Sequence, residues 1–241
     1  AGGNAINSMI SENITGVEFI AINSDFQDLQ KSKSKRVIQI GKNIAKGLGV
    51  GGDPSLGSEC AKADQNEITD ALQGADMVFI TAGMGGGTGT GASPVVAKLA
   101  RDAGALTIAI VTKPFEFEAN KRITQADSGI NDLTKEVDSI IVIPNDRLKE
   151  VQQISGIADS FKAADSVLTK AVRGISDIIV GSGFINVDFA DVKKIMTESG
   201  GKALMGTGEG EGTSRAIEAS ENAITSPLLE DISIDGATGI L

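Results

Sequence analysis

The run Gly85-Gly86-Gly87-Thr88-Gly89-Thr90-Gly91 has the residue types of a loop that binds phosphate. It follows the apolar run 77–80 and precedes the helix-like stretch 94–100. Its five glycines allow positive-φ conformations that turn successive N–H groups inward, and the next helix adds the positive end of its dipole. The threonine hydroxyls can bond phosphate or magnesium, and Pro94 suits a first helical turn. We therefore predict a phosphate site rather than a flexible surface turn.

No lysine follows this run, so it is not a Walker A loop, and backbone amides with a metal ion must bind the phosphates instead. The chain also opens with Gly2-Gly3-Asn4 and continues as a helix, which is typical of the end of a second glycine-rich turn whose strand lies upstream. Asp25 follows about twenty residues later, so a dinucleotide site with this carboxylate on a ribose hydroxyl is an alternative. That alternative leaves the run 85–91 without a role.

Asp188 and Asp191 lie three residues apart in the segment 186–191, at the predicted start of a helix. At this spacing two carboxylates can share a helix face. Such a pair can orient and polarise a water molecule. Aspartates also cap helix N-termini, so an ordinary helix start remains the alternative.

Composition excludes several classes of function. With 32 acidic and 22 basic residues the net charge is −10, which argues against nucleic acid and anionic membranes as partners and implies a cation with any bound nucleotide. The chain has no histidine, which excludes histidine bases, triads and metal sites. Cys60 is the only cysteine, so a reducing compartment fits. No apolar run approaches the roughly 20 residues of a membrane span and no signal peptide is evident, so we expect a soluble, cytoplasmic protein.

The elements that must position these residues alternate between short apolar runs and amphipathic segments, the rhythm of a parallel α/β sheet. We predict strands at 17–22, 37–40, 77–80, 106–111 and 140–143, with covering helices such as 57–73 and 118–136. Ligands bind at the carboxyl ends of such strands, where Asn23, Asp25, the run 85–91 and Pro114 fall.

A long apolar stripe predicts one helix from 157 to about 180, roughly 35 Å in length. Beyond it the composition becomes rich in glycine, with helix-like segments only at 189–198 and 214–224. This change indicates the start of a second domain.

These motifs together resemble the FtsZ family of bacterial cell-division GTPases in the tubulin superfamily. Residues 85–91 are similar to the family's signature loop, 117–122 resemble its sugar-contacting segment, and 186–191 match its catalytic loop. The resemblance implies a Rossmann-like, parallel-sheet GTP-binding domain over 1–156. A central helix over 157–181 and a truncated second α+β domain with the catalytic loop, over 182–241, would follow.

The resemblance also implies GTP or GDP as ligand, with Mg²⁺ held mainly by phosphates and water. Asp165 would read guanine, whose N1–H and exocyclic amine are adjacent donors, although alone it also fits a solvated helix position. Glu118 and Arg122 would lie at the ribose, although their spacing also fits a surface ion pair. The loop 47–54 would sense the γ-phosphate, unless it is an ordinary mobile turn. The implied nucleotide-binding residues are Gly2, Gly3, Asn4, Asn23, Asp25, Gly51, Gly85, Gly86, Gly87, Thr88, Gly89, Thr90, Gly91, Pro114, Glu118, Arg122, Phe161 and Asp165.

Asn186, Asp188 and Asp191 would be catalytic by the same resemblance. If Asp165 contacts the base, the two aspartates lie about 30 Å away past the long helix, out of reach of the same nucleotide. They would then complete the site of a neighbouring subunit, which demands a head-to-tail filament.

The implied role is GTP hydrolysis in a division ring in the cytoplasm at mid-cell. Partners would be further copies of the chain, with membrane tethers and regulators bound through a C-terminal tail, and neither nucleic acid binding nor direct membrane insertion is expected. A tubulin-like filament for plasmid segregation or cell shape, or a switch that binds nucleotide without turnover, is the alternative.

Overall fold

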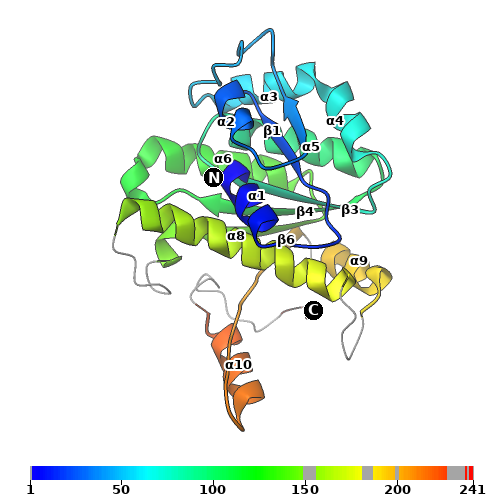
Figure 1. Cartoon of the computed structure of the whole chain (residues 1–241), viewed down its shortest axis with the longest axis vertical. Coiled ribbons are helices and arrows are strands. Elements are labelled where there is room, and N and C mark those ends of the chain that lie inside the picture. The colour runs from blue at the N-terminus through cyan, green and yellow to red at the C-terminus, as the bar shows by residue number, and fades with distance from the viewer. Residues whose placement is uncertain are drawn as a thin grey trace.

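The computed structural model describes residues 2–148, 156–180, 187–198, 201–226, 237 and 239–240 (Figure 1). The strands in this part of the chain are β1 (Ile20–Asn23), β2 (Arg36–Gln39), β3 (Met77–Gly83), β4 (Leu106–Lys113), β5 (Ser139–Pro144) and β6 (Gly201–Ala203). The helices are α1 (Gly2–Ser11), α2 (Phe26–Gln30), α3 (Pro54–Ala63), α4 (Gln65–Leu72), α5 (Thr88–Asp102), α6 (Asn120–Thr134), α8 (Ile157–Val180), α9 (Phe189–Glu198) and α10 (Arg215–Ile224), with short 3₁₀ turns η1 (Glu116–Glu118) and η2 (Asn145–Arg147).

The strands form two parallel sheets. β1 pairs with β2, and β3, β4, β5 and β6 pair in that order. The five predicted strands and their parallel arrangement are confirmed. The expectation of one sheet was wrong, because no described hydrogen bond joins β1 to β3.

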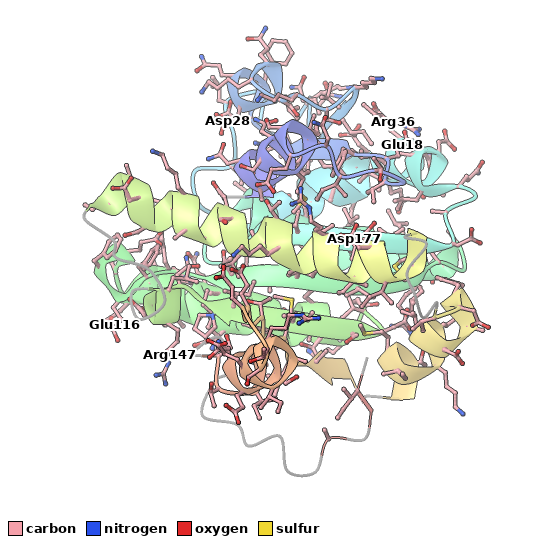
Figure 2. All side chains as sticks on the ribbon, turned by 60° about the horizontal axis from the view of Figure 1, so that its bottom comes forward. Glu18, Asp28, Arg36, Glu116, Arg147 and Asp177 are labelled. Carbon is pink, nitrogen blue, oxygen red and sulfur yellow. The ribbon has the colours of Figure 1, made fainter. Side chains whose placement is uncertain are left out.

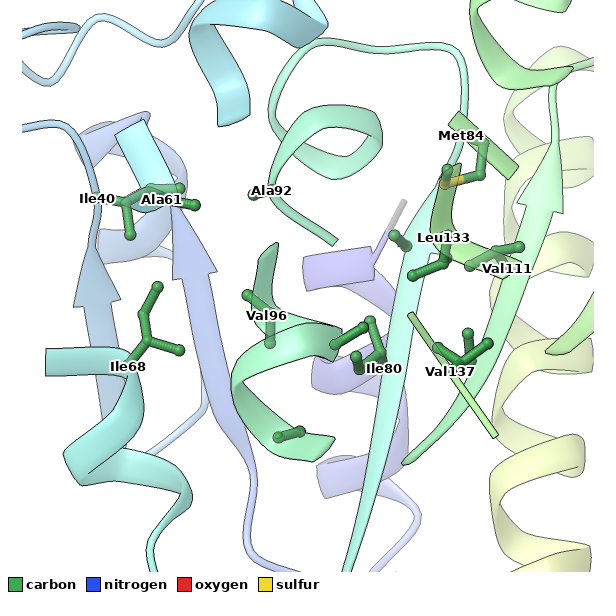
Figure 3. Close-up of a cluster of buried hydrophobic side chains, with 14 of the residues drawn as sticks. Ile40, Ala61, Ile68, Ile80, Met84, Ala92, Val96, Val111, Leu133 and Val137 are labelled. Atoms are coloured by element: carbon green, nitrogen blue, oxygen red, sulfur yellow. The ribbon is translucent and has the colours of Figure 1, made fainter. Parts of the chain in front are cut away.

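Each face of the larger sheet has its own apolar core. β4 is buried along nearly its whole length, as expected for a parallel strand covered on both sides. Its Ala109 and Val111 pack in a cluster with α3, α4, α5 and α6, part of which Figure 3 shows. Its Ile108 and Ile110 point to the other face and pack in a cluster with α1 and α8. The fold is therefore a sheet between two helical layers.

Helix α8 lies along the second of these cores. Ala164, Val167, Leu168, Ala171 and Val172 are buried at the spacing of one helical face. At 1.5 Å per residue its 24 residues span about 36 Å. One end of α8 consequently lies near α6 and the other end beside α9, with α1 across its middle (Figure 1).

Three predicted helix boundaries were wrong. The stretch 57–73 divides at Asp64, whose carboxylate accepts the N–H of Gly41 at 2.6 Å. The stretch 118–136 begins as a helix only at Asn120, because Ala119 has a φ of +84°. Pro94 is inside α5 rather than in its first turn, since the glycine run is itself helical from Thr88 onward.

Helices α3 and α5 touch through glycines. A Cβ on Gly91 would collide with the carbonyl oxygen of Pro54, and one on Gly57 with the carbonyl oxygen of Gly87. Both helices need these glycines because their backbones are in direct contact.

Helix α10 extends away from the sheet (Figure 1) and buries none of its own side chains. The preceding segment approaches it through Gly206, Gly208 and Gly210, where a Cβ would meet the α10 backbone. The two pieces form a unit through close backbone contact rather than an apolar core.

No helix in the described ranges combines the length and apolar character needed to cross a bilayer.

Two glycine-to-alanine changes should have opposite effects, because only one of them lies at the close contact of α3 and α5. Gly91→Ala should destabilise the fold by about 3 kcal/mol or more, because the new methyl group overlaps the α3 backbone. Gly174→Ala, inside α8 and with no atom near its Cβ position, should stabilise by about 0.5–1 kcal/mol. Urea unfolding of both variants measures the difference. Equal free energies of unfolding would contradict the direct contact.

Candidate functional site

Several predicted site residues meet at the carboxyl ends of β1 and β3. A cavity of about 1200 Å³ runs along both strands, and at this end Gly2, Gly3, Asn4, Asn23, Thr88 and Gly89 line it. They come from three separate segments of the chain, which the parallel strand arrangement brings to one edge. The clustering of these six residues is thus a property of the fold.

The glycines of the run 85–91 have different structural roles. Only Gly85 of the run uses the positive φ that glycine allows, with a value of +99°. Gly87 and Gly89 are needed for close contact, since a Cβ would lie 2.8 Å from the backbone nitrogen of Asp53 or 2.9 Å from the carbonyl oxygen of Gly83. A Cβ on Gly86 would have no neighbour within 4 Å, so the loop is open at this residue.

The start of α5 has the properties of an anion site. The first N–H groups of any helix lack intrahelical partners, and no side chain caps α5 at Gly87. These N–H groups therefore point out along the positive end of the helix dipole. These groups suit phosphate oxygens.

The two threonines of the run are fixed by hydrogen bonds. Thr90 is 3% exposed, and its hydroxyl accepts the N–H of Gly85 at 2.9 Å, which closes the loop. The Thr88 hydroxyl lies 2.7 Å from that of Ser24, which directly follows β1. Sequence reasoning had not assigned a role to Ser24, although its place after a strand was a usable signal.

Asn23 and Asp25 shape the end of β1. The carboxylate of Asp25 caps α2 by accepting the N–H groups of Gln27 at 2.9 Å and Asp28 at 3.2 Å. The Asn23 side chain accepts the N–H of Asp25 at 3.2 Å. The Asp25 carboxylate is thus engaged as a helix cap, which weakens the dinucleotide alternative.

The loop before α3 lies against the glycine run. Asp53 caps α3 through the N–H of Ser55 at 2.8 Å, and Gly51 is exposed with a φ of +59°. The carbonyl of Gly52 accepts a hydrogen bond from Gln125 of α6 at 3.2 Å. Hydrogen bonds therefore hold this loop to the first turn of α3 and to α6.

Three phenylalanines form a cluster at the end of β4, after the buried Pro114. Phe115 is fully buried and stacks on Phe117 with ring centroids 4.9 Å apart. Phe161 of α8 meets the edges of both rings and is 38% exposed. Sequence reasoning named Phe161 and placed Phe117 in the sugar-contacting segment 117–122. It missed Phe115 and the cluster itself, because the pairing of the η1 segment with α8 is not local.

Glu118 and Arg122 form the ion pair that their spacing allowed, with a distance of 2.6 Å. Glu118 also accepts the backbone N–H of Phe115 at 3.0 Å. A Cβ on Gly85 would lie 2.6 Å from the carbonyl oxygen of Arg122. The start of α6 thus packs directly on the glycine run.

The turn η2 supports this region. The N–H of Glu116 donates to the Asp146 carboxylate at 3.0 Å, so η1 and η2 lie together on the edge where Figure 2 labels Glu116 and Arg147. Asn145, which precedes Asp146, is 4% exposed, and its side-chain oxygen has no partner among the described atoms. Sequence reasoning missed Asn145, although it directly follows a strand at the ligand-binding edge.

Asp165 lies one helical turn after Phe161 on α8. Burial raises the pKa of its carboxyl from 3.8 to about 6. A carboxyl with a raised pKa, one helical turn from the partly exposed Phe161, is a candidate for ligand recognition.

The predicted catalytic aspartates are elsewhere. Asp188 accepts the N–H of Asp191 at 3.0 Å and so caps α9, as the alternative reading of the pair had it. Both aspartates are exposed, and Asn186 lies outside the described residues. Since α9 adjoins the far end of α8 (Figure 1), the fold does not bring either aspartate to the glycine run.

Comparison with protein families gives two matches. The model described as "Tubulin/FtsZ family, GTPase domain" matches residues 1–153. The model described as "FtsZ family, C-terminal domain" matches residues 201–241.

Individual proteins that are similar to this chain belong to the same family. Cell division protein FtsZ of Buchnera aphidicola subsp. Schizaphis graminum is 54% identical over 241 residues, and that of Wigglesworthia glossinidia brevipalpis is 53% identical over 242. Each match covers all of this chain and 62% of the relative. The chain therefore spans less than two thirds of the length of these relatives.

Solved structures are similar too. An empty FtsZ dimer from M. jannaschii has a TM-score of 0.91 at 46% identity, over 95% of this chain and 66% of that one. The GTPγS-bound protofilament of CetZ2 from Haloferax volcanii has a TM-score of 0.75 at 26% identity, over 87% and 64% respectively.

Burial of Asp165 predicts a pH-dependent stability. Between pH 4 and 6 the folded chain keeps this proton while the unfolded chain has lost it, so stability falls as pH rises through that window. Asp165→Asn should therefore be about 2 kcal/mol more stable than the parent at pH 7.5 and equally stable at pH 3.5. Denaturant unfolding across this pH range measures the difference.

Asp177→Asn, at an exposed position on the same helix (Figure 2), is the matched control and should leave the pH dependence unchanged. A stability gain of Asp165→Asn that is the same at pH 3.5 and 7.5 would rule out ionisation as its cause.

Proposed function

The chain belongs to the Tubulin/FtsZ family, as its motifs predicted, and from that premise we propose that it binds GTP at the carboxyl edge of its strands and hydrolyses it between subunits. The observation that carries the proposal is the uncapped start of α5, which presents free N–H groups beside the open Gly86. A polyphosphate is the ligand that such a site suits best.

The phosphates would bind to the first turn of α5 and to Gly86, with Gly2, Gly3 and Asn4 on the other side of the cavity. The run supplies N–H groups but no cationic side chain, so a Mg²⁺ ion with the nucleotide fits its chemistry. Its ligands would be chiefly phosphate oxygens and water, and bound Mg²⁺ would neutralise charge that develops on the γ-phosphate. Gly51, in the loop that contacts the run, would lie toward the γ-phosphate.

The base would lie at the aromatic cluster. Phe161 and Phe117 expose ring surface, and Asp165 lies one helical turn after Phe161. The Asp165 carboxylate can accept both N1–H and the exocyclic amine of guanine. The Glu118–Arg122 pair, which adjoins Gly85, would lie between base and phosphates, at the ribose. The unpaired oxygen of Asn145 is a further acceptor on this edge.

Hydrolysis would require a second copy of the chain. Asp188 and Asp191 lie past the far end of α8, so they would reach only the nucleotide of a neighbour stacked head to tail. There the pair would orient a water molecule toward the γ-phosphate, releasing phosphate and leaving GDP. Asn186 belongs to the same predicted segment. The FtsZ dimer and the CetZ2 protofilament among the similar structures support assembly of this kind.

We assign the filament to a cytoplasmic division ring at mid-cell, because the relatives of 53–54% identity are cell division proteins whereas CetZ2 is only 26% identical. Membrane tethers and regulators of the ring would then be its partners.

The base contact predicts a ligand-specific effect. Asp165→Asn should weaken GDP binding at least tenfold or so at pH 7.5, because the amide opposes a donor to two donors of guanine. The loss should be smaller for IDP, which lacks the exocyclic amine. Isothermal titration calorimetry of GDP and IDP against the parent chain and Asp165→Asn gives the four affinities of a double-mutant cycle. Equal losses for GDP and IDP would place Asp165 away from that amine.

Catalysis between subunits predicts that GTP turnover per subunit rises steeply above a threshold protein concentration. Asp191→Ala should reduce turnover by about 100-fold or more without weakening GDP binding, because its carboxylate acts on the neighbour's nucleotide. Phosphate release against protein concentration, with the chain extended to the length of its relatives, measures both. Asp102→Ala, at the exposed end of α5, is the control.

Turnover that is independent of concentration, or parental turnover in Asp191→Ala, would exclude this mechanism. Tight GDP binding without hydrolysis at any concentration would instead support a nucleotide-dependent switch.

A further inference from the structure

The segment 28–36, which joins α2 to β2, is a basic patch on an acidic chain. Its cations are Lys31, Lys33, Lys35 and Arg36. Asp28 is the one acidic residue of the segment, whereas the whole chain has a net charge of −10. The three lysines are exposed, while Ser34 between two of them is buried. The patch therefore presents its ammonium groups to solvent.

Hydrogen bonds hold the backbone of the basic patch in one shape. The Asn7 side chain of α1 accepts the N–H of Lys33 at 2.7 Å and donates to the carbonyl of Lys31 at 3.2 Å. The Ser34 hydroxyl donates to the carbonyl of Arg36 at 2.8 Å. A ligand would thus meet a preformed surface, and binding would not require ordering of this backbone.

Only two of the four cations have acidic partners within the described ranges. The ion pairs are Lys31–Asp28 at 3.1 Å and Arg36–Glu18 at 3.8 Å, and Figure 2 labels both acids. The Lys33 ammonium donates to the neutral hydroxyl of Ser11 at 2.6 Å. Lys35 forms no ion pair with any described residue. Two positive charges therefore remain available to a ligand.

Strand β2, which follows the basic patch, has a free edge. Within the described part of the chain β2 pairs only with β1, and Figure 3 shows it as the outermost strand, leading up to Ile40. The N–H of Ile40 bonds to the carbonyl of Asn23 on the β1 side. Because backbone groups alternate in direction along a strand, Val37 and Gln39 point their N–H and C=O groups away from β1. Val37 is 47% exposed, so this edge is open to solvent.

The free edge and the two unpaired charges together select the chemistry of a ligand. A free strand edge needs a row of N–H and C=O groups, which an extended peptide supplies and a lipid headgroup or a nucleic acid does not. The lysines favour acidic side chains in that peptide, and they oppose pairing of this edge with the same edge of a second copy.

The size of the ligand follows from the charge of the rest of the chain. A membrane surface or a long nucleic acid would extend past the basic patch onto a chain whose net charge is −10. A short peptide would stay within the screening length of roughly 8 Å around the lysines at physiological salt. The patch therefore suits a short acidic segment better than a broad polyanion.

We propose that the free edge of β2, together with Lys33 and Lys35, is the docking site of a short, extended, acidic peptide segment of a partner protein. The segment adds to the sheet as a strand, and its backbone pairs with Val37 and Gln39. Side chains on one face of a strand repeat about every 6.7 Å, so carboxylates at alternate positions reach both ammonium groups. None of these four residues belongs to the proposed nucleotide site, so docking of the peptide does not depend on any nucleotide.

The test titrates the intact 241-residue chain into a rhodamine-labelled peptide of about eight residues that alternates glutamate and valine. Fluorescence anisotropy should show saturable binding of one peptide per chain. Raising the salt from about 50 to about 300 mM should weaken the binding about fivefold or more, because salt screens the charges. Peptides of the same length that alternate glutamine and valine, or lysine and valine, should bind about tenfold more weakly or worse.

Variants separate the charge from the strand edge. Lys33→Gln combined with Lys35→Gln should weaken binding of the glutamate peptide by about tenfold or more. The matched control is Lys62→Gln combined with Lys98→Gln, at exposed positions of α3 and α5, and it should bind as the parent does. Val37→Pro removes an N–H that faces away from β1, so it should preserve the sheet and weaken the peptide about fivefold.

Hydrogen exchange followed by mass spectrometry reports the added strand directly. Exchange in β2 should slow on addition of the glutamate peptide in the parent chain, while α8 serves as the internal reference. Equal binding of the three peptides, or parental binding by the variant that lacks both Lys33 and Lys35, would overturn the proposal. Binding that leaves β2 unprotected, or that Val37→Pro does not weaken, would show a loose electrostatic contact in place of an added strand.

Other anions are tested in parallel with the same variants. The probes are vesicles of phosphatidylglycerol and a single-stranded oligothymidylate. Tighter binding of either probe than of the glutamate peptide, with the same dependence on Lys33 and Lys35, would contradict a peptide ligand and assign the patch to a lipid surface or a nucleic acid.

Discussion

Close contact between backbones at the start of α5 is the constraint on which the rest of the site depends. Gly87, Gly89 and Gly91 let α5 approach the loop before α3, the end of β3 and the α3 backbone, while Gly85 touches the start of α6. Because these contacts are made by backbone atoms, they leave no room for adjustment by side-chain rotation. The helix N-terminus that would bind phosphate is therefore fixed relative to every element around it.

Helix α8 imposes a second constraint, which is distance. Its apolar face is held on the sheet over most of its 24 residues, so it acts as a rigid spacer with Asp165 near one end and α9 beside the other. The nucleotide site and the Asp188–Asp191 pair, which the proposed GTP hydrolysis needs together, are thereby kept apart within one chain. Assembly is then a geometric requirement of the proposed chemistry, because the missing carboxylates are available only from another copy.

The sequence predicted the larger elements well and the local details less well. The five predicted strands and helix α8 follow from apolar runs and stripes, since burial on one or both faces determines those patterns. The start of α5 was missed because a glycine run favours a loop when its neighbours are unknown. The roles of Phe115 and Asn145 and the contact of Phe117 with Phe161 were missed, because burial and ring contacts depend on segments that are distant in the sequence.

By itself, the sequence determined the class of the fold, the order of its elements and the family, since these depend on residue types and spacings that recur along the chain. Only the tertiary structure decided which glycine takes a positive φ, that Asp188 caps α9, that burial raises the pKa of Asp165, and that Phe161 meets Phe115 and Phe117. The reason is physical. A positive φ, a cap, a desolvated carboxyl and an aromatic contact each depend on atoms that local sequence does not specify.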